Sequence, residues 1–284
     1  MRRRRIFGMI GASLFGGVLS ACGVPATLPT TSGTPSGMST ANDGSSAVSN
    51  EPLSLAVASS LAAVMQALGP RYAKLYKAPQ PLTQAAASSA LAQQIVAGAQ
   101  FDVFIAADMS AMQPLIAANI IAESDVHAIA QTDLVIVARP DRGLVSITDL
   151  TKPGVKIVVA DETVPAGRYT TLLLKAIQKR TGEIGFVASF TQNVVSYEDK
   201  ASAVTQKFFA GDVDVAVMYA ADLHGREPAT YSIIPLPKQV HITSTYFAVV
   251  LPGAKIGAIE FVNLLTDATN TAVWSEYGFR TIRK

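Results

Sequence analysis

Short apolar runs alternate with longer segments of helical periodicity from residue 51 onward. The apolar runs are rich in alanine and β-branched residues, which is typical of buried strands. We expect strands at 53–58, 102–106, 134–138, 155–160, 213–219, 233–236 and 245–251. Between them, apolar residues recur every three or four positions, so that Leu61, Met65, Leu68 and Tyr72 share one helix face. We expect helices at 61–76, 90–97, 109–118, 167–181, 201–210 and 256–276.

Strands that alternate with helices indicate an α/β fold with mostly parallel sheets. The sequence contains no internal repeat. In such sheets, ligands bind in a crevice at the carboxyl ends of the strands, where the helices begin. Helix N-termini there offer unpaired N–H groups and a positive dipole end, so they can bind an anion without lysine or arginine.

Four turns at strand ends carry small polar residues, a proline or a tyrosine. They are 58–61 (ASSL), 87–91 (ASSAL), 164–167 (VPAG) and the strand end at Tyr219. Taken singly, each turn is explained by a helix cap or a tight helix entry. Four of them at equivalent strand ends favour a polar, uncharged pocket for an anion.

The N-terminus reads as an export signal. Four arginines precede an apolar stretch, and the segment ends in Leu19-Ser20-Ala21-Cys22, which resembles the lipobox of bacterial lipoproteins. We therefore expect residues 1–21 to be a signal peptide and Cys22 to carry a lipid that anchors the protein outside the cytoplasm. The alternative is an unmodified Cys22 inside a short membrane helix.

Residues 22–50 are expected to be a flexible linker. From 23 to 50, 18 of 28 residues are Gly, Pro, Ser or Thr, and no apolar periodicity is present. Such a coil spans about 30 Å on average, enough to hold a domain clear of a bilayer. Because Cys22 is the only cysteine, an internal disulfide and a cysteine-based zinc site are excluded.

The charge of the chain gives no support for a nucleic-acid partner. Lys and Arg total 23 and Asp and Glu total 21, but four of the arginines lie in the predicted signal peptide. Without it, 19 basic residues face 21 acidic ones, and the net charge becomes −2. A mildly acidic chain lacks the basic character of nucleic-acid-binding proteins.

Five segments, in order, resemble successive motifs of the periplasmic molybdate-binding proteins of ABC importers, the ModA type. They are 55–65 (LAVASSLAAVM), 87–99 (ASSALAQQIVAGA), 101–108 (FDVFIAAD), 164–169 (VPAGRY) and 211–222 (GDVDVAVMYAAD). The ending at 277–279 (YGF) also matches, so the resemblance covers 53–284.

The resemblance implies a type II periplasmic-binding-protein fold, in which two α/β lobes are joined by two crossing strands and close on the ligand. On this basis, lobe 1 comprises 51–131 plus 245–284, and lobe 2 comprises 132–244. The crossings are expected near 132–138 and 242–250.

The resemblance also implies which residues bind the anion. Family members hold a tetrahedral oxyanion with neutral donors, which here are the hydroxyls of Ser60, Ser88 and Tyr219 and the backbone amides of Ser60, Ala166 and Ala201. A shift of one residue would make the last amide that of Lys200. Ser59 stands where the family usually has alanine, Ala201 where it has valine, and Ala221 where it has serine or threonine, which bears on fine selectivity.

The chemistry of these donors favours a fully deprotonated dianion. Molybdate, tungstate and sulfate offer only acceptor oxygens, whereas a protonated phosphate also needs a carboxylate that accepts its hydrogen. An organic anion normally requires an arginine, and we expect Arg168 to point outward from its helix. Another dianion, tungstate alone or sulfate, remains an alternative ligand, and an organic anion is a weaker one.

The sequence predicts a binding protein without catalysis. His127, on an expected helical stretch, and His224 and His241, in loops or at a strand edge, have unrelated contexts, and no nucleophile-elbow, P-loop or dinucleotide motif is present. Asp102, Asp108 and Asp222 suggest a metal site at first sight, but we interpret them as helix caps or lobe contacts. An adhesion or scaffold lipoprotein is the remaining alternative.

Together, these observations predict a monomeric, lipid-anchored extracytoplasmic protein that captures molybdate and tungstate and delivers them to an ABC permease. It needs no cofactor and no nucleic-acid partner, and it contacts the membrane through Cys22.

Overall fold

The computed structural model describes residues 49–282. The predicted signal peptide (1–21), Cys22 and all but the last two residues of the predicted linker lie outside this range, so they stay predictions. The described residues belong to one compact unit. None of their helices is long and apolar enough to cross a membrane.

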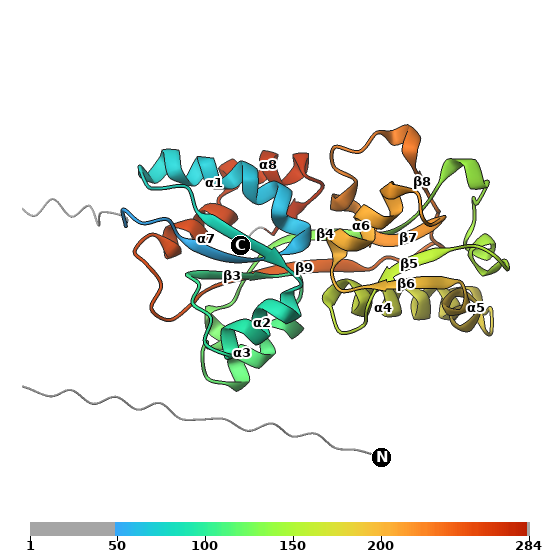
Figure 1. Ribbon diagram of the computed structural model, residues 1–284, viewed down its shortest axis with the longest axis horizontal. Coiled ribbons are helices and arrows are strands. Elements are labelled where there is room, and N and C mark those ends of the chain that lie inside the picture. Colours follow the sequence, from blue (N-terminus) through green and yellow to red (C-terminus); the bar gives the residue numbers. More distant parts are fainter. Residues whose placement is uncertain (1–48, 283–284) are drawn as a thin grey trace, which may run out of the picture. The chain divides into compact units, whose positions relative to one another are not determined.

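Ten strands and eight α-helices make up the described fold (Figure 1). The strands are β1 (Ser54–Ala58), β2 (Leu82–Ala86), β3 (Val103–Ala106), β4 (His127–Ala138), β5 (Ile157–Ala160), β6 (Val194–Glu198), β7 (Val215–Tyr219), β8 (Ser232–Ile233), β9 (Thr243–Val250) and β10 (Arg280–Thr281). The helices are α1 (Ala62–Tyr76), α2 (Ser88–Val96), α3 (Gln113–Ala117), α4 (Pro165–Thr181), α5 (Phe186–Gln192), α6 (Ala201–Ala210), α7 (Ala258–Thr266) and α8 (Thr271–Glu276).

The strands form two lobes that share β4 and β9. Their order is β2-β1-β3-β9-β4-β7-β5-β6, and β8 and β10 also pair with β4. Pairing is parallel where β1 meets β2 and β3, and where β5 meets β6 and β7. Every pairing that involves β4 or β9 is antiparallel. We call the group around β1–β3 the first lobe and the group around β5–β7 the second lobe.

Strand β4 passes from one lobe into the other. Its first part, from His127 to Asp133, pairs with β9, and its second part, from Leu134 to Ala138, pairs with β7. The amide of Leu134 also donates to the carbonyl of Ile242, at 2.8 Å, just before β9 begins. Of the predicted crossings near 132–138 and 242–250, the first lies beside β9 only at its start, and the second lies beside β4 up to Ala248. The predicted division into lobes stays a prediction.

The alternation of side chains along each strand builds a core on both faces of the first lobe. On β1, Leu55 and Val57 face a cluster with α1, α7 and α8, whereas Ala56 faces another with α2 and α3. A third cluster fills the second lobe, where β5 and β7 pack against α4, α5 and α6. The predicted helix face of Leu61, Met65, Leu68 and Tyr72 is buried in the first of these cores.

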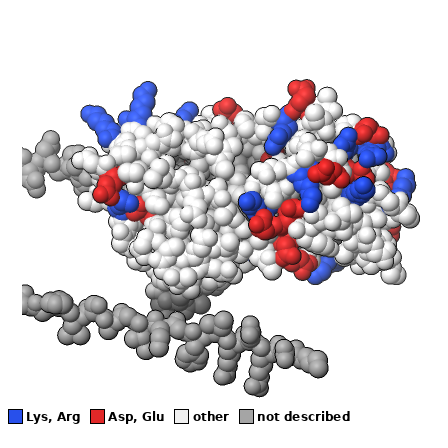
Figure 2. All heavy atoms as spheres, in the orientation of Figure 1, with Lys and Arg blue, Asp and Glu red and all other residues white. Residues whose placement is uncertain are grey.

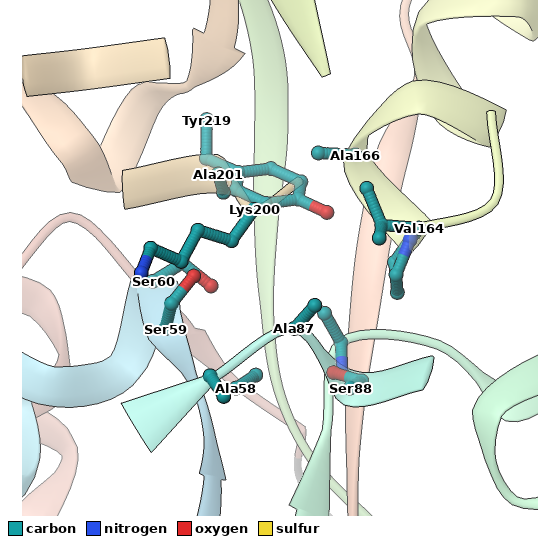
Figure 3. Close-up of a pocket in the computed structure, with 13 residues that line it drawn as sticks. Ala58, Ser59, Ser60, Ala87, Ser88, Val164, Ala166, Lys200, Ala201 and Tyr219 are labelled. Carbon is teal, nitrogen blue, oxygen red and sulfur yellow. The ribbon is translucent and has the colours of Figure 1, made fainter. Parts of the chain in front are cut away.

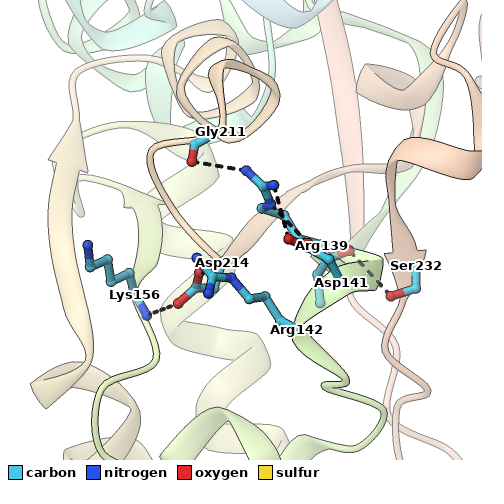
Figure 4. Close-up of polar contacts among 8 residues, drawn as sticks. Arg139, Asp141, Arg142, Lys156, Gly211, Asp214 and Ser232 are labelled. Atoms are coloured by element: carbon cyan, nitrogen blue, oxygen red, sulfur yellow. Dashed lines mark hydrogen bonds and ion pairs between the residues drawn. The ribbon is translucent and has the colours of Figure 1, made fainter.

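In both lobes, an aspartate just before an inner strand holds the start of its neighbour. Asp102 precedes β3 and accepts from the Ser54 and Lys255 amides, at 2.6 and 2.7 Å. Asp214 precedes β7 and accepts from the amide of Lys156, at 2.9 Å, while Arg142 lies 2.8 Å from its other oxygen (Figure 4). The two carboxylates thus fix the register of strands that end at the interlobe crevice.

The inner strands and long helices follow the sequence pattern, but the edges do not. Strands β2, β6 and β10, helix α5 and the first part of β4 were not predicted from the sequence. Strand β2 is mostly exposed, and β6 is at most half-buried along its length, because both lie at the edges of the sheet order. The helix expected at 256–276 is two helices, since Asp267 caps a 3-10 turn by accepting from the Thr269 amide, at 2.7 Å.

Charged side chains of both signs are mixed on the face shown in Figure 2, and they gather over the second lobe. The first lobe is mostly uncharged on this face. This face therefore offers no uniformly basic surface of the kind that nucleic acids bind.

Candidate functional site

The residues that the sequence predicts to bind an anion line one small cavity between the lobes (Figure 3). They are Ser60, Ser88, Ala166, Ala201 and Tyr219. The rest of the lining is Ala58, Ser59, Ala86, Ala87, Ala107, Val164, Pro165 and Lys200. The cavity volume available to the centre of a water molecule is about 10 Å³, which is enough for one water molecule. The structure therefore brings together segments more than a hundred residues apart in the sequence.

Three helix N-termini meet at this cavity without a side-chain cap among the described residues. Helix α2 begins at Ser88, α4 at Pro165 and α6 at Ala201, and none has an acidic residue in its first turn. Their N-cap residues are Ala87, Val164 and Lys200, and none of these side chains bonds a first-turn amide. The positive ends of three dipoles thus face one space, as an anion requires.

The two buried or half-buried serines of the cavity each have one hydrogen-bond partner in the protein. Ser88 is buried and does not cap its helix; instead, its Oγ accepts from the amide of Ala107, at 3.0 Å. Ser60 is half-buried, and its Oγ lies 2.9 Å from the hydroxyl of Tyr246. Both serines therefore have a protein partner on one side and reach the cavity on the other.

Tyr219 carries a polar atom that is left unpaired. Its side chain is 1% exposed, and its hydroxyl has no hydrogen-bond partner in the part of the chain that the structure describes. Burial raises the pKa of Tyr219 well above its ordinary value, so the hydroxyl keeps its hydrogen at neutral pH. A buried donor without a partner that points into a cavity is suited to an acceptor ligand.

The carboxylates near the strand ends hold structure and do not line the cavity, within residues 49–282. Asp108 caps the 3-10 turn after β3 by accepting from the Ala111 amide, at 2.9 Å. Asp222 accepts from the amide of Tyr219, at 3.2 Å. These contacts agree with the interpretation of Asp108 and Asp222 as caps or lobe contacts, whereas Asp102 holds the start of β1 within the first lobe. No cluster of metal-ligating side chains occurs among the described residues.

Arg168 does not point outward, and our expectation for it is wrong. Its Nη2 and Nε lie 2.7 and 3.1 Å from Oδ2 of Asp108, and its Nη1 donates to the carbonyl of Thr163, at 2.9 Å. The Asp108 side chain is only 8% exposed and needs a counter-charge, which Arg168 supplies. The ion pair joins α4 of the second lobe to the end of β3 in the first.

The three histidines lie away from the cavity lining. His127 is the first residue of β4 and not part of a helix. Nδ1 of His224 lies 2.7 Å from the carbonyl of Glu276, and its ring stacks on Tyr277 at 4.1 Å. His241 is exposed in the loop before β9. These positions fit surface or structural residues, as the unrelated contexts of the three histidines in the sequence suggest.

The sequence model of the bacterial extracellular solute-binding proteins matches residues 53–280. The chain belongs to this family. It is a family of binding proteins and not of enzymes, in agreement with the sequence prediction.

Among relatives of this solute-binding protein are molybdate-binding proteins of mycobacteria. The Molybdate-binding protein ModA of Mycobacterium tuberculosis (strain H37Rv) is 28% identical over 198 residues, which cover 68% of this chain and 71% of the relative. The corresponding protein of Mycobacterium bovis has the same identity and coverage.

Solved structures confirm the predicted periplasmic-binding-protein fold of this solute-binding protein. The sulfate-binding protein SubI from Mycobacterium tuberculosis has a TM-score of 0.72 at 16% identity and covers 81% of this chain and 87% of its own. The Azotobacter vinelandii periplasmic molybdate-binding protein has a TM-score of 0.65 at 17% identity and covers 80% and 98%. A substrate-binding domain of a putative molybdenum ABC transporter from Clostridium difficile has 0.61 at 23%, and covers 82% and 99%. At these identities, the likeness concerns the fold alone.

Two contacts of the site were not predicted from the sequence. The amide of Ser202 in α6 lies 3.4 Å from Oγ of Ser59, across the crevice, and Tyr246 of β9 reaches Ser60. Neither Ser202 nor Tyr246 lies in one of the five motifs. The alternating pattern of β9 could have indicated only that Tyr246 is buried.

Proposed function

We propose that this solute-binding protein captures molybdate or tungstate in the cavity between its lobes and delivers it to an ABC permease. The observation that carries the proposal is a cavity lined by three helix N-termini and by the hydroxyl of Tyr219, none of which has a side-chain cap or partner within residues 49–282. The mycobacterial relatives support the choice of molybdate.

In this proposal, every group that contacts the anion is a neutral donor. Ser60, Ser88 and Tyr219 give their hydroxyl hydrogens, and Ser60, Ala166 and Ala201 give amide hydrogens. Because the amide of Ser202 is directed at Ser59, the free amide at the start of α6 belongs to Ala201 or its neighbour Lys200. Charged donors are not required, since helix ends and buried hydroxyls favour negative charge themselves.

The size of the donor set suits tight binding. A hydrogen bond to a charged group contributes about 1.5–3 kcal/mol. Five to seven such bonds, less the costs of desolvation and closure, support the ~8–12 kcal/mol of a micromolar-to-nanomolar binder. The cavity has room for little more than one water molecule, so in this proposal the anion enters while the lobes are apart and is covered when they close.

The cavity also favours one kind of anion. A monoprotonated phosphate needs an acceptor for its hydrogen, and no carboxylate lines the cavity among the described residues. Sulfate has the same donor requirement as molybdate, so discrimination between them rests on size. Tungstate is nearly as large as molybdate and should bind with it.

The location of the protein is a separate proposal. Extracytoplasmic location follows from the family. We propose in addition that Cys22 carries a lipid anchor and that residues 22–50 tether a monomeric domain to it. Within that domain, the lobes divide at 131/132 and 244/245. Mass spectrometry of the N-terminal peptide tests the anchor, and Cys22→Ala should release the protein from the membrane fraction. An unmodified Cys22 in the membrane-bound protein would overturn it.

Calorimetry tests the ligand directly. The mature chain, freed of bound anion, is titrated with molybdate, tungstate, sulfate and phosphate. We expect one-to-one binding of the first two, with sulfate at least about a hundredfold weaker. Stronger binding of sulfate or phosphate would show that the specificity is wrong, and no binding to any of the four would overturn the oxyanion proposal.

A further inference from the structure

Tyr246 contacts Ser60 but does not itself line the cavity. It lies on β9, where it pairs with Ala130 of β4, and its side chain is fully buried. Its hydroxyl oxygen is 2.9 Å from Oγ of Ser60, and either atom can be the donor. The direction of this bond decides where the hydrogen of Ser60 points.

The ring of Tyr246 is held from two sides. Phe279 packs edge-on at 5.4 Å between ring centroids, and Tyr219 at 6.0 Å. Burial raises the pKa of Tyr246 well above its ordinary value, so its hydroxyl keeps its hydrogen at neutral pH. The nearby hydroxyl of Ser244 already donates to the carbonyl of Ala107, at 2.8 Å. Tyr246 is thus a fixed, protonated hydroxyl placed against Ser60.

We infer that Tyr246 is a positioning residue for the captured anion. Its hydroxyl donates to Oγ of Ser60, and Ser60 in turn donates into the cavity. An anion that offers only acceptor oxygens needs a hydrogen bond from the hydroxyl of Ser60. Ser60 then cannot donate the same hydrogen to Tyr246. In the opposite direction, Ser60 would give its hydrogen to Tyr246, and the cavity would lose one of its donors.

The second serine of the cavity follows the same rule. Oγ of Ser88 accepts from the amide of Ala107, at 3.0 Å, so a protein hydrogen occupies one of its lone pairs as well. Both serines therefore receive a hydrogen from the protein and give their own to the cavity. Donors linked in this way polarise one another, which strengthens the outer bond.

A double-mutant cycle tests this role, which rests on the proposed capture of an oxyanion. Tyr246→Phe, Ser60→Ala and the double variant are titrated with molybdate by calorimetry. We expect Tyr246→Phe to weaken binding about tenfold, as loss of one hydrogen bond and its orientation implies. In the Ser60→Ala background, the same change should have no further effect, because the two residues act through one bond.

Tyr72→Phe is the matched control. Tyr72 is also fully buried in the first lobe, and its hydroxyl donates to the carbonyl of Gly257, at 3.1 Å. This variant loses a bond of the same kind away from the cavity. It should lower the melting temperature, as Tyr246→Phe does, and leave the affinity for molybdate unchanged.

The outcomes separate this role from the proposed function. Unchanged affinity in Tyr246→Phe, or an equal loss in both backgrounds, would overturn the positioning role while wild-type binding stands. If the wild type bound none of the four anions, the proposed function would fall and this role with it. Proton NMR of the molybdate complex tests the same bond without the Tyr246→Phe variant. We expect a slowly exchanging tyrosine hydroxyl signal that Ser60→Ala removes, and its persistence in that variant would contradict the inferred bond.

Discussion

At the scale of single residues, Tyr219 separates stability from binding. Its buried hydroxyl has no partner within the described residues, so removing it takes away no bond inside the protein. We expect Tyr219→Phe to leave the melting temperature of the ligand-free protein unchanged or raised. The same variant should weaken molybdate binding about 10- to 100-fold, because one charge-assisted hydrogen bond is lost. Thermal melting and calorimetry check the two effects, and a variant that loses stability but binds as the wild type would contradict this role.

Asp222 should make the stability of the protein depend on pH. Burial raises its pKa from 3.8 to about 7, while the bond from the Tyr219 amide acts in the opposite direction. The folded state therefore holds this proton more tightly than the unfolded state. The stability that the protonated group contributes is complete below about pH 4 and is lost as the pH rises to about 7.

Asp222→Asn keeps an acceptor for the Tyr219 amide and removes the charge. We expect the free energy of unfolding of the wild type to fall more steeply between pH 5 and pH 8 than that of the variant. Urea unfolding at the two pH values measures this difference. Parallel pH dependence of the two proteins would show that Asp222 is ionised in the folded state without penalty.

The residues of the cavity were predictable because each lies in a motif at a strand end. Ser60 follows the apolar run of β1 and Tyr219 ends that of β7, whereas Ser88 follows the exposed strand β2 and was predicted from the family resemblance of its motif. Parallel strands bring their carboxyl ends to one edge. The sequence could not place Arg168 or Tyr246. Their partners, Asp108 and Ser60, lie 60 and 186 residues away, and only the packed lobes bring them into contact.

At the scale of elements, the start of α4 depends on a close backbone approach. A methyl group on Gly167 would lie 1.9 Å from the carbonyl oxygen of Asp161. This oxygen belongs to the backbone, which cannot move aside as a flexible side chain can. Gly167→Ala should lower the free energy of unfolding by roughly 1–3 kcal/mol or more. It should also weaken molybdate binding, since the amide of Ala166 moves with the helix start.

Gly69→Ala in α1 is the control for this substitution. Its added methyl would meet only atoms of Gln80 and Pro81 at 3.5 Å or more, and alanine is the better helix former. We expect unchanged or higher stability and unchanged affinity. Urea unfolding and calorimetry compare the two variants. If Gly167→Ala behaved as Gly69→Ala does, the close approach at α4 would not matter for the site.

The elements themselves were predictable to the extent that they are buried. Inner strands such as β5 and β7 are continuous apolar runs, and α6 begins and ends at the predicted residues. The edge strands β2 and β6 have at most a few half-buried positions, so their sequences carry little pattern. Their place in the sheet comes from backbone pairing with β1 and β5, which side-chain periodicity does not encode.

At the scale of the whole molecule, contacts between the lobes should set how long the anion stays bound. The ion pair of Arg168 and Asp108 and the contact of Ser202 with Ser59 both cross the crevice. Opening of the lobes has to separate these groups, and the buried carboxylate of Asp108 then loses its counter-charge. A contact that forms after capture slows release more than it speeds entry.

Asp108→Asn tests this expectation without removing the cap of the 3-10 turn, because an amide oxygen can still accept from Ala111. We expect molybdate to dissociate about tenfold faster, with little change in its association rate, in stopped-flow measurements of tyrosine and tryptophan fluorescence. Arg142→Ala is the control, since its partner Asp214 lies in the same lobe and lobe opening does not separate the pair (Figure 4). That variant should lose stability and keep the wild-type dissociation rate. Equal dissociation rates for Asp108→Asn and the wild type would mean that the pair holds α4 in place and does not retain the ligand.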